Sequence, residues 1–380
     1  MGIYDELGVR RLINASGTNT VLGGSLMPEP VLQAMLDAAR SYVTLRELQD
    51  RAGARIAELV GVEAALISSG AAGGITLAAA ACIAGADQDR IHRLPDTTGL
   101  KNEIVVVCSD RPNYMYQAAE HVGARLVHVG APDRVSPEDF AEAIGPRTAA
   151  VLLIVATLDR MRACSAGVTA TVESVCEVAR RRGVPVLVDA AAELPPMANF
   201  RAFLEMGADV AIFSGGKAIR GPQCTGLVLG RRDLVEAAAM NNSPYSAIGR
   251  PMKVGKEEIA GLVRAVELFV QRDEQAELRD WERSSRRVAE ALSGLPGVNA
   301  EVVASGIYAR PPITPVCRVQ VDEAVVGSPL GVVARRLLEG EPAVAVGRSD
   351  GCLIVNPMTL GRGEENAVAQ QLLRVLADRR

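Results

Sequence analysis

The 380-residue sequence has few aromatic side chains, only three histidines and no long uninterrupted apolar run. No stretch approaches the roughly 18 consecutive apolar residues that a transmembrane helix requires. The opening residues, MGIYDELGVRRLINASG, carry charges where a secretory signal peptide has an apolar core. We therefore expect a cytoplasmic protein that neither spans a membrane nor is exported by the usual route.

The potential metal ligands are sparse as well. The seven cysteines are scattered and form no C-x-x-C pair, which argues against a disulfide framework and against structural zinc. His92, His121 and His128 do not cluster with them, so no metal centre is expected. A net charge of −4 and a pI near 5.7 give no basic surface for nucleic acid, which we do not expect as a partner.

Short β-rich runs alternate with helical patterns from about Ala64 to Leu229. The runs are AALISS, EIVVVC, RLVHVG, AAVLLIVA, VPVLVD, VAIFS and TGLVLG. This alternation predicts an α/β fold with a mainly parallel sheet and helices on both faces. Ligands of such sheets bind beyond the carboxyl ends of the strands, where several polar clusters of this chain fall.

The domain boundaries follow from changes in this pattern. We expect a large domain over residues 46–255, and one long connector helix that begins at 256 and ends near Ser293–Gly297. Strand-like and helical segments after it predict a small α+β domain, so that residues 256–380 form the connector and the C-terminal domain. Residues 1–45 are expected to pack on the small domain or on a partner subunit.

An acid and a lysine follow neighbouring strands of the large domain. Asp189 ends VPVLVD, and Lys217 follows VAIF in the turn SGGK. A pyridoxal phosphate (PLP) enzyme needs this pair, because its lysine binds the cofactor covalently and its acid keeps the pyridine nitrogen protonated. Loss of solvation lowers the pKa of such a lysine and favours the reactive amine. The alternatives are a solvated loop lysine and an aspartate that caps a helix or binds a metal.

A glycine-rich turn, Ser69–Gly74, lies between the strand AALIS and an apolar helical pattern. Its small residues allow backbone N–H groups to approach a phosphate at a helix N-terminus. It has neither the G-K-[ST] of a Walker loop nor a G-x-G-x-x-G dinucleotide turn, and close packing alone is the alternative. Ser214, in the lysine turn, is a candidate second phosphate contact.

Three further positions could complete the site. Arg111 in SDRPNYMY follows a strand end, so Arg111, Asn113 or Tyr114 could cover the cofactor ring.

Cations gather in two other places. Arg250 and Lys253 lie in GRPMKVGK, a basic segment that suits an anionic substrate but is also typical of a solvated turn. Arg348 could bind an α-carboxylate through two hydrogen bonds, or form a surface ion pair.

Several motifs together resemble a known family. They are RLINASGTNTVLGGS, ELQDRAGARIAELVG, SSGAAGG, LPDTTGLKNE, VDAAAELPP, FSGGKAIRGPQCTGL and GRPMKVGKEEI. The chain resembles the selenocysteine-synthase-like group of fold-type-I PLP enzymes, and within it the D-glucosaminate-6-phosphate ammonia-lyase branch. The resemblance implies a Schiff-base role for Lys217 and a pyridinium partner in Asp189. It assigns the phosphate contacts to Gly70, Ala71, Ala72 and Ser214.

The resemblance also implies a homodimer or higher homo-oligomer with active sites at subunit interfaces, where GRPMKVGK would reach a neighbour. VNPMTL has Met358 where many relatives carry an arginine. Arg348 or Arg362 could take the role of that arginine. The N-terminal extension with which bacterial selenocysteine synthases hold tRNA is missing, which argues against a tRNA substrate.

The implied reaction is α,β-elimination from a small anionic amino acid or amino-sugar acid, which gives a 2-keto-3-deoxy acid and ammonia. Racemases, aldolases, aminotransferases and selenium-transferase-like enzymes form the same carbanion, so these reactions are alternatives. A non-catalytic PLP-binding module is the remaining alternative.

Overall fold

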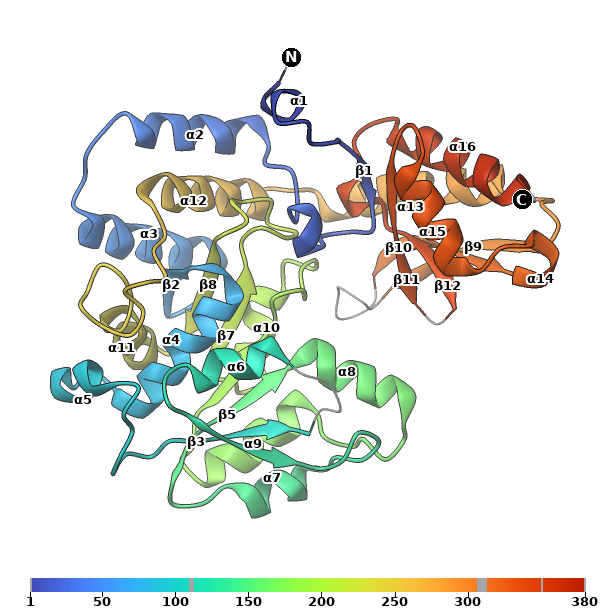
Figure 1. Ribbon diagram of the computed structural model, residues 1–380. Helices are drawn as coiled ribbons and strands as arrows, with labels where there is room; N and C mark the ends of the chain where they lie inside the picture. The colour runs from blue at the N-terminus through green and yellow to red at the C-terminus, as the bar shows by residue number, and fades with distance from the viewer. Residues whose placement is uncertain (1, 109–112, 306–312, 350, 379–380) are drawn as a thin grey trace. The chain divides into compact units, whose positions relative to one another are not determined.

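The computed structural model describes residues 2–108, 113–305, 313–349 and 351–378, which form two compact units (Figure 1). The larger unit comprises Met27–Gln271, and the smaller unit combines Met1–Leu26 with Arg272–Arg380. No helix in these ranges is long and apolar enough to cross a membrane.

The larger unit contains a seven-stranded sheet with the order β2-β8-β7-β6-β5-β3-β4. β8 is antiparallel to both of its neighbours, and the other pairs are parallel, as the alternating pattern predicts. The strands are β2 (Ala64–Ser68), β3 (Glu103–Val107), β4 (Arg125–Val129), β5 (Thr148–Ile154), β6 (Val186–Asp189), β7 (Val210–Ser214) and β8 (Gly226–Gly230).

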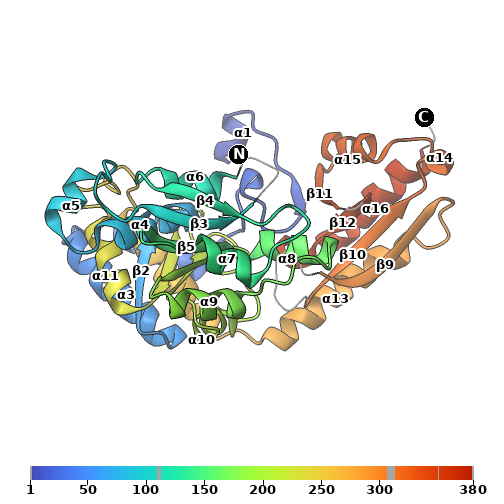
Figure 2. The ribbon, with the colours of Figure 1, turned by 90° about the horizontal axis from the view of Figure 1, so that it is seen from below.

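Helices cover both faces of this sheet, because each buried strand has apolar residues on its two sides. Figure 2 shows α6 and α9 on opposite sides of β3 and β5. The helices are α2 (Glu29–Ala39), α3 (Leu45–Val60), α4 (Gly70–Ala84), α5 (Gln88–Arg93), α6 (Tyr114–Glu120), α7 (Pro137–Ala143), α8 (Val155–Cys164), α9 (Val172–Arg181), α10 (Asn199–Glu205), α11 (Arg232–Met240) and α12 (Lys256–Val270).

Helix α4 is buried on nearly all sides and packs directly on the sheet. A Cβ added to Gly74 would lie 2.8 Å from Cγ2 of Ile212, on β7. The glycine therefore permits the close approach that brings the first turn of α4 to the sheet edge.

The smaller unit is built on a five-stranded sheet with the order β1-β11-β12-β10-β9. Its strands are β1 (Ile13–Ala15), β9 (Val298–Ser305), β10 (Thr314–Val321), β11 (Val344–Ser349) and β12 (Cys352–Val355). Its helices are α1 (Ile3–Glu6), η1 (Thr20–Leu22), α13 (Glu274–Ala291), α14 (Glu323–Val326), α15 (Leu330–Glu339), η2 (Pro357–Thr359) and α16 (Glu364–Ala377). β1 pairs with β11 in parallel, so an N-terminal segment completes a sheet whose other strands lie between Val298 and Val355.

The single connector helix predicted from residue 256 onward is wrong. The helical pattern is split into α12 and α13 by a turn at Gln271–Asp273, where the Asp273 carboxylate accepts a hydrogen bond from the Ala276 N–H at 2.9 Å. An aspartate at this position starts a new helix. The boundary between the two units lies after Gln271 rather than at residue 255, because α12 packs on α2 and α3 of the larger unit.

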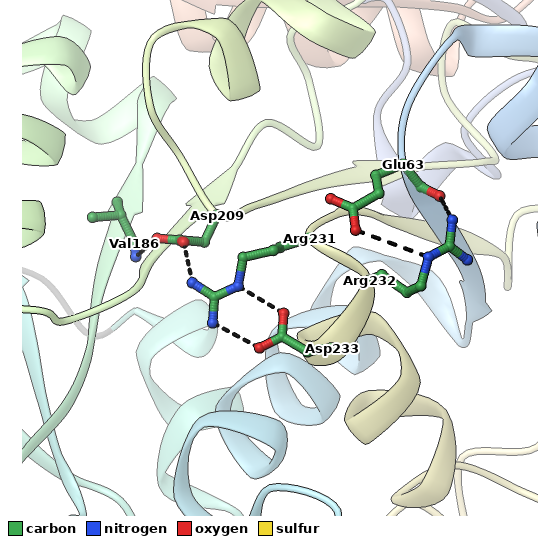
Figure 3. A network of polar contacts seen from close by, with 6 residues as sticks. All are labelled: Glu63, Val186, Asp209, Arg231, Arg232 and Asp233. Atoms are coloured by element: carbon green, nitrogen blue, oxygen red, sulfur yellow. Dashed lines mark hydrogen bonds and ion pairs between the residues drawn. The ribbon is translucent and has the colours of Figure 1, made fainter.

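The strand ends opposite the lysine turn are joined by a polar network around Asp209 (Figure 3). One carboxylate oxygen of Asp209 accepts a hydrogen bond from the Val186 N–H at 2.8 Å, and the other lies 2.6 Å from Nη1 of Arg231. The same guanidinium binds both oxygens of Asp233, at 2.7 and 2.9 Å. The network joins the starts of β6 and β7 to the start of α11.

We predict that Asp209→Ala lowers the free energy of unfolding by about 2 kcal/mol, because a half-buried backbone N–H and an arginine both lose their acceptor. Urea unfolding measures this. The control is Glu177→Ala, which removes only an exposed ion pair with Arg181 and should cost less than about 0.5 kcal/mol. Equal effects in the two variants would show that the network does not stabilise the sheet.

Candidate active site

The predicted acid and lysine emerge at the same edge of the sheet, from neighbouring parallel strands. Asp189 is the last residue of β6 and pairs with Ile212 of β7, and the Ala190 N–H donates to the Ile212 carbonyl at 2.9 Å. Ser214 ends β7, and Lys217 follows in the next turn. Because adjacent strands lie about 4.8 Å apart, the segments after β6 and β7 leave the sheet side by side.

Asp189 is buried, with 4% of its surface exposed. Its Oδ1 accepts a hydrogen bond from the Ala191 N–H at 3.0 Å. Burial raises the pKa of Asp189, although this hydrogen bond and the charge of Lys217 act in the opposite direction. A buried carboxylate is costly without a nearby cation, and the protonated nitrogen of a pyridine ring is a cation of the right kind.

Lys217 is half-buried. Burial lowers the pKa of Lys217, while the carboxylates of Asp189 and Glu193 act to raise it. A lowered pKa increases the fraction of neutral amine, which is the form that attacks an aldehyde.

The lysine turn is held by short backbone contacts. The Gly215 N–H donates to the Thr225 carbonyl and the Gly221 N–H donates to the Gly215 carbonyl, both at 2.8 Å. A Cβ on Gly215 would lie 2.1 Å from Oγ1 of Thr225, so only glycine fits. Arg220 has a φ of 59°, in the left-handed region that L-residues rarely adopt. These features fix the backbone on both sides of Lys217.

The glycine-rich turn lies at the same edge, two strands away from the lysine turn. Gly226 of β8 pairs with Ser68 on one side and with Ser214 on the other, which places the start of α4 level with Ser214. A Cβ on Gly226 would lie 2.4 Å from the carbonyl carbon of Gly70, so this glycine permits the close approach.

The start of α4 has the features of an anion site. Gly70 has a φ of +68°, and a Cβ there would meet nothing within 4 Å, so open space lies in front of the helix. Ser69, the N-cap, makes no side-chain capping hydrogen bond, which leaves the first N–H groups available to a ligand. One edge of the sheet is thus lined by Gly70, Ala71, Ala72, Ser214, Asp189 and Lys217. Their backbone N–H groups, hydroxyl, carboxylate and amine are the groups that PLP requires.

Of the residues predicted to cover the ring, Tyr114 is the first residue of α6, and Asn113 caps that helix by accepting from the Met115 N–H at 3.0 Å. Burial raises the pKa of Tyr114, and the negative charge of Asp189 adds to the effect. Asn113 is used as a cap. Arg111 lies outside the described residues.

The basic segment passes close to the glycine-rich turn of its own unit. Sδ of Met252 lies 3.7 Å from the position of a Cβ on Gly73, in the first turn of α4. Arg250 and Lys253 are exposed on this segment. Lys256 instead pairs with Glu257 and donates to the Ala38 carbonyl at 2.7 Å.

Arg348 belongs to β11 in the smaller unit. It lines a cavity of roughly 620 Å³ together with polar residues of the N-terminal segment and of the turn after β12. These polar residues include Ser16, Asn19 and Asn356. Met358 is 2% exposed and packs inside this unit, whereas Arg362 is exposed.

Glu193 is a site neighbour that we did not predict from the sequence. It is 3% exposed and lies in the loop after Asp189, within the motif VDAAAELPP. The signal was a second acid four residues beyond the first, in a segment otherwise made of small and apolar residues.

Comparisons with known proteins identify the family of this chain. A family profile described as L-seryl-tRNA selenium transferase matches residues 12–280. A 5'-C-glycyluridine monooxygenase-decarboxylase from a Streptomyces species is 34% identical over 99% of this chain and 92% of its own length. A D-glucosaminate-6-phosphate ammonia lyase from Salmonella typhimurium is 30% identical over 98% of this chain and 97% of its own length.

The fold has a full-length counterpart. A solved structure of D-glucosaminate-6-phosphate ammonia-lyase, 30% identical in sequence, matches with a TM-score of 0.82 over 99% of this chain and 98% of that chain. The resemblance inferred from the motifs and the predicted fold-type-I class are therefore confirmed.

We predict that Gly226→Ala weakens PLP binding on the order of tenfold, because the added Cβ displaces Gly70 and the first turn of α4. The dissociation constant is measured by the absorbance change on titration with PLP. Gly145→Ala is the matched control, since a Cβ there meets nothing within 4 Å and should leave the affinity unchanged. An unchanged affinity in Gly226→Ala would show that the cofactor does not use this turn.

Proposed function

The chain belongs to the L-seryl-tRNA selenium transferase family and has PLP as its cofactor, and we propose that it is a lyase of the ammonia-lyase type. The observation that carries the proposal is the pairing of a buried Asp189 with Lys217 at one sheet edge, level with the open start of α4. The full-length match to an ammonia lyase supports the reaction class.

Each group at this edge has one role in binding the cofactor. Lys217 would hold it covalently, and Asp189 would keep the ring nitrogen protonated. The N–H groups of Gly70, Ala71 and Ala72, with the Ser214 hydroxyl, would bind its phosphate. Bound PLP supplies an electron sink for the charge that develops at the substrate's α-carbon.

The protein's own groups then perform acid–base chemistry. Nζ of Lys217, once released, removes the proton from the α-carbon, which requires the neutral amine favoured by its burial. The β-hydroxyl leaves with a proton as water, and water re-enters when the nitrogen is released. The net conversion is a 3-hydroxy-2-amino acid to a 2-keto-3-deoxy acid and ammonia.

The substrate is proposed to be a small anionic amino acid or amino-sugar acid. Arg250 and Lys253 are exposed cations on the segment beside α4, and Arg348 lines a polar cavity in the smaller unit. Each is proposed to bind an anionic group of the substrate.

We also propose a homodimer or higher homo-oligomer in the cytoplasm. Large apolar side chains are exposed along α2 and just beyond it, among them Leu36 at 51% and Tyr42 at 101%. Exposed apolar side chains gathered on one segment are typical of a surface that associates.

A second candidate function is oxidative decarboxylation. It is favoured by the relative named as a monooxygenase-decarboxylase, whose sequence matches over nearly the whole of both chains. The two reactions differ in their need for oxygen, because only the lyase reaction proceeds unchanged without it.

We predict that Lys217→Ala abolishes turnover, by at least about a thousandfold, because it removes both the covalent attachment and the base. Amino-sugar acids and D- and L-hydroxyamino acids are assayed for ammonia, 2-keto acid and carbon dioxide, with and without oxygen. Lys101→Ala, at an exposed lysine, is the control.

Wild-type protein should be yellow and should be labelled covalently on borohydride reduction, whereas Lys217→Ala should not trap the cofactor. Full activity in Lys217→Ala would overturn the assignment. Carbon dioxide release that depends on oxygen would favour the second candidate.

A further inference from the structure

The cavity of the smaller unit has one charged group and no acid among its described lining residues. The charged group is Arg348, and the part of the chain that the structure describes offers its guanidinium no carboxylate partner. Neutral polar and apolar side chains line the rest, and a volume of roughly 620 Å³ suits a small organic molecule. A cation among neutral groups indicates that the occupant is an anion.

One buried side chain of this cavity has an open donor. Asn356 is 3% exposed and directly follows β12. Its Oδ1 accepts a hydrogen bond from the Met358 N–H at 3.0 Å, which identifies the oxygen end of the amide. Its Nδ2 meets no acceptor among the described residues and is not sealed from solvent, so it opens onto the cavity. A buried amide donor of this kind is costly unless a ligand or water accepts its hydrogen bond.

The N-terminal motif RLINASGTNT lies beside this amide. A Cβ on Gly17 would lie 2.8 Å from Nδ2 of Asn356, so the glycine leaves the amide uncovered. Gly17 has a φ of +83°, in the left-handed region that favours glycine. The motif is fixed to the turn after β12, because the Asn356 N–H donates to the Ala15 carbonyl and Oγ1 of Thr359 donates to the Asn14 carbonyl, both at 2.8 Å.

The same motif supplies an acceptor. The Ser16 hydroxyl donates to Oδ1 of Asn14 at 2.9 Å, so its proton is used and its oxygen is left to accept a hydrogen bond. Ser16 lines the cavity together with Asn356 and Arg348. A ligand hydroxyl both donates and accepts, and a carboxylate needs a cation. The three side chains therefore match an acid that carries hydroxyl groups.

We propose that Asn356 is a specificity-determining residue, whose Nδ2 donates to a hydroxyl oxygen of a polyhydroxylated acid while Arg348 pairs with the carboxylate of that acid. The open donor makes the cavity selective, because an acid without hydroxyl groups leaves the buried amide unpaired. The inference rests on the proposed function in taking an acid of the amino-sugar type as the substrate. It adds the group by which the smaller unit distinguishes such an acid from an unsubstituted one.

The test compares two six-carbon acids that differ only in their hydroxyl groups. D-Gluconate and n-hexanoate are titrated into the full-length protein with its PLP, and the dissociation constants are measured by isothermal titration calorimetry. Neither acid has an amino group, so neither is turned over. D-Gluconate should bind at least about tenfold more tightly, because only its hydroxyls satisfy the amide. Equal affinities, or no binding of D-gluconate, would overturn the proposal.

A variant tests the amide itself. Asn356→Ser keeps a hydroxyl that can accept from the Met358 N–H, but it removes the Nδ2 donor. The preference for D-gluconate over n-hexanoate should fall by about tenfold. Asn299→Ser, the same change at an exposed asparagine of β9, should leave the preference unchanged. An unaltered preference in folded Asn356→Ser would contradict the proposal.

Arg348→Ala covers the case in which Asn356→Ser does not fold, since Arg348 is exposed. It should weaken the binding of both acids by about tenfold and leave their ratio unchanged, because both carry the carboxylate. Undiminished binding of D-gluconate would overturn the assignment of the cavity. A protein that forms ammonia but binds the two acids equally would disprove this inference alone, whereas one that prefers D-gluconate without forming ammonia would disprove only the lyase reaction.

Discussion

The site depends on keeping a carboxylic acid and an amine out of water at the same sheet edge. Burial disfavours the charged form of each, so the pKa of Asp189 rises and that of Lys217 falls. Asp189 is therefore better suited to pair with a cationic ring, and Lys217 to attack a carbonyl carbon, than the two are to form an ion pair with each other. The glycine turn, the buried strands and the helices on both faces serve to hold these two groups in the same place without solvent.

The antiparallel strand β8 determines what else meets at that edge. It lies between β2 and β7, so Gly226 brings the start of α4 and Ser214 to one level. Three glycines make the approach possible, because a Cβ at Gly74, Gly215 or Gly226 would collide with the neighbouring segment. The fold thus brings the proposed phosphate site and Lys217 to one sheet edge, from segments about 145 residues apart.

Much of this arrangement follows from local patterns. Strand ends, the glycine turn and the two reactive residues are visible because hydrophobic runs stop at polar residues. β1 and β11 were missed, because three residues such as Ile13–Ala15 carry no periodicity and form a strand only by pairing with a distant partner. The break at Asp273 was hidden by continuous helical spacing on both sides. Glu193 was overlooked because its burial depends on the packing of the loop after β6, which sequence spacing does not specify. The roles of Arg250, Lys253 and Arg348 depend on substrate contacts, which local sequence does not specify.

The pairing of β1 with β11 has a consequence for how the protein is made. Ile13 is synthesised long before its partner Val344, from which it is separated by the whole of the larger unit. The larger unit, encoded between them, can fold during translation while the N-terminal strand waits unpaired. Completion of the smaller unit is thus a late, long-range closure, and Ala15, which is fully buried in the finished unit, stays exposed until then.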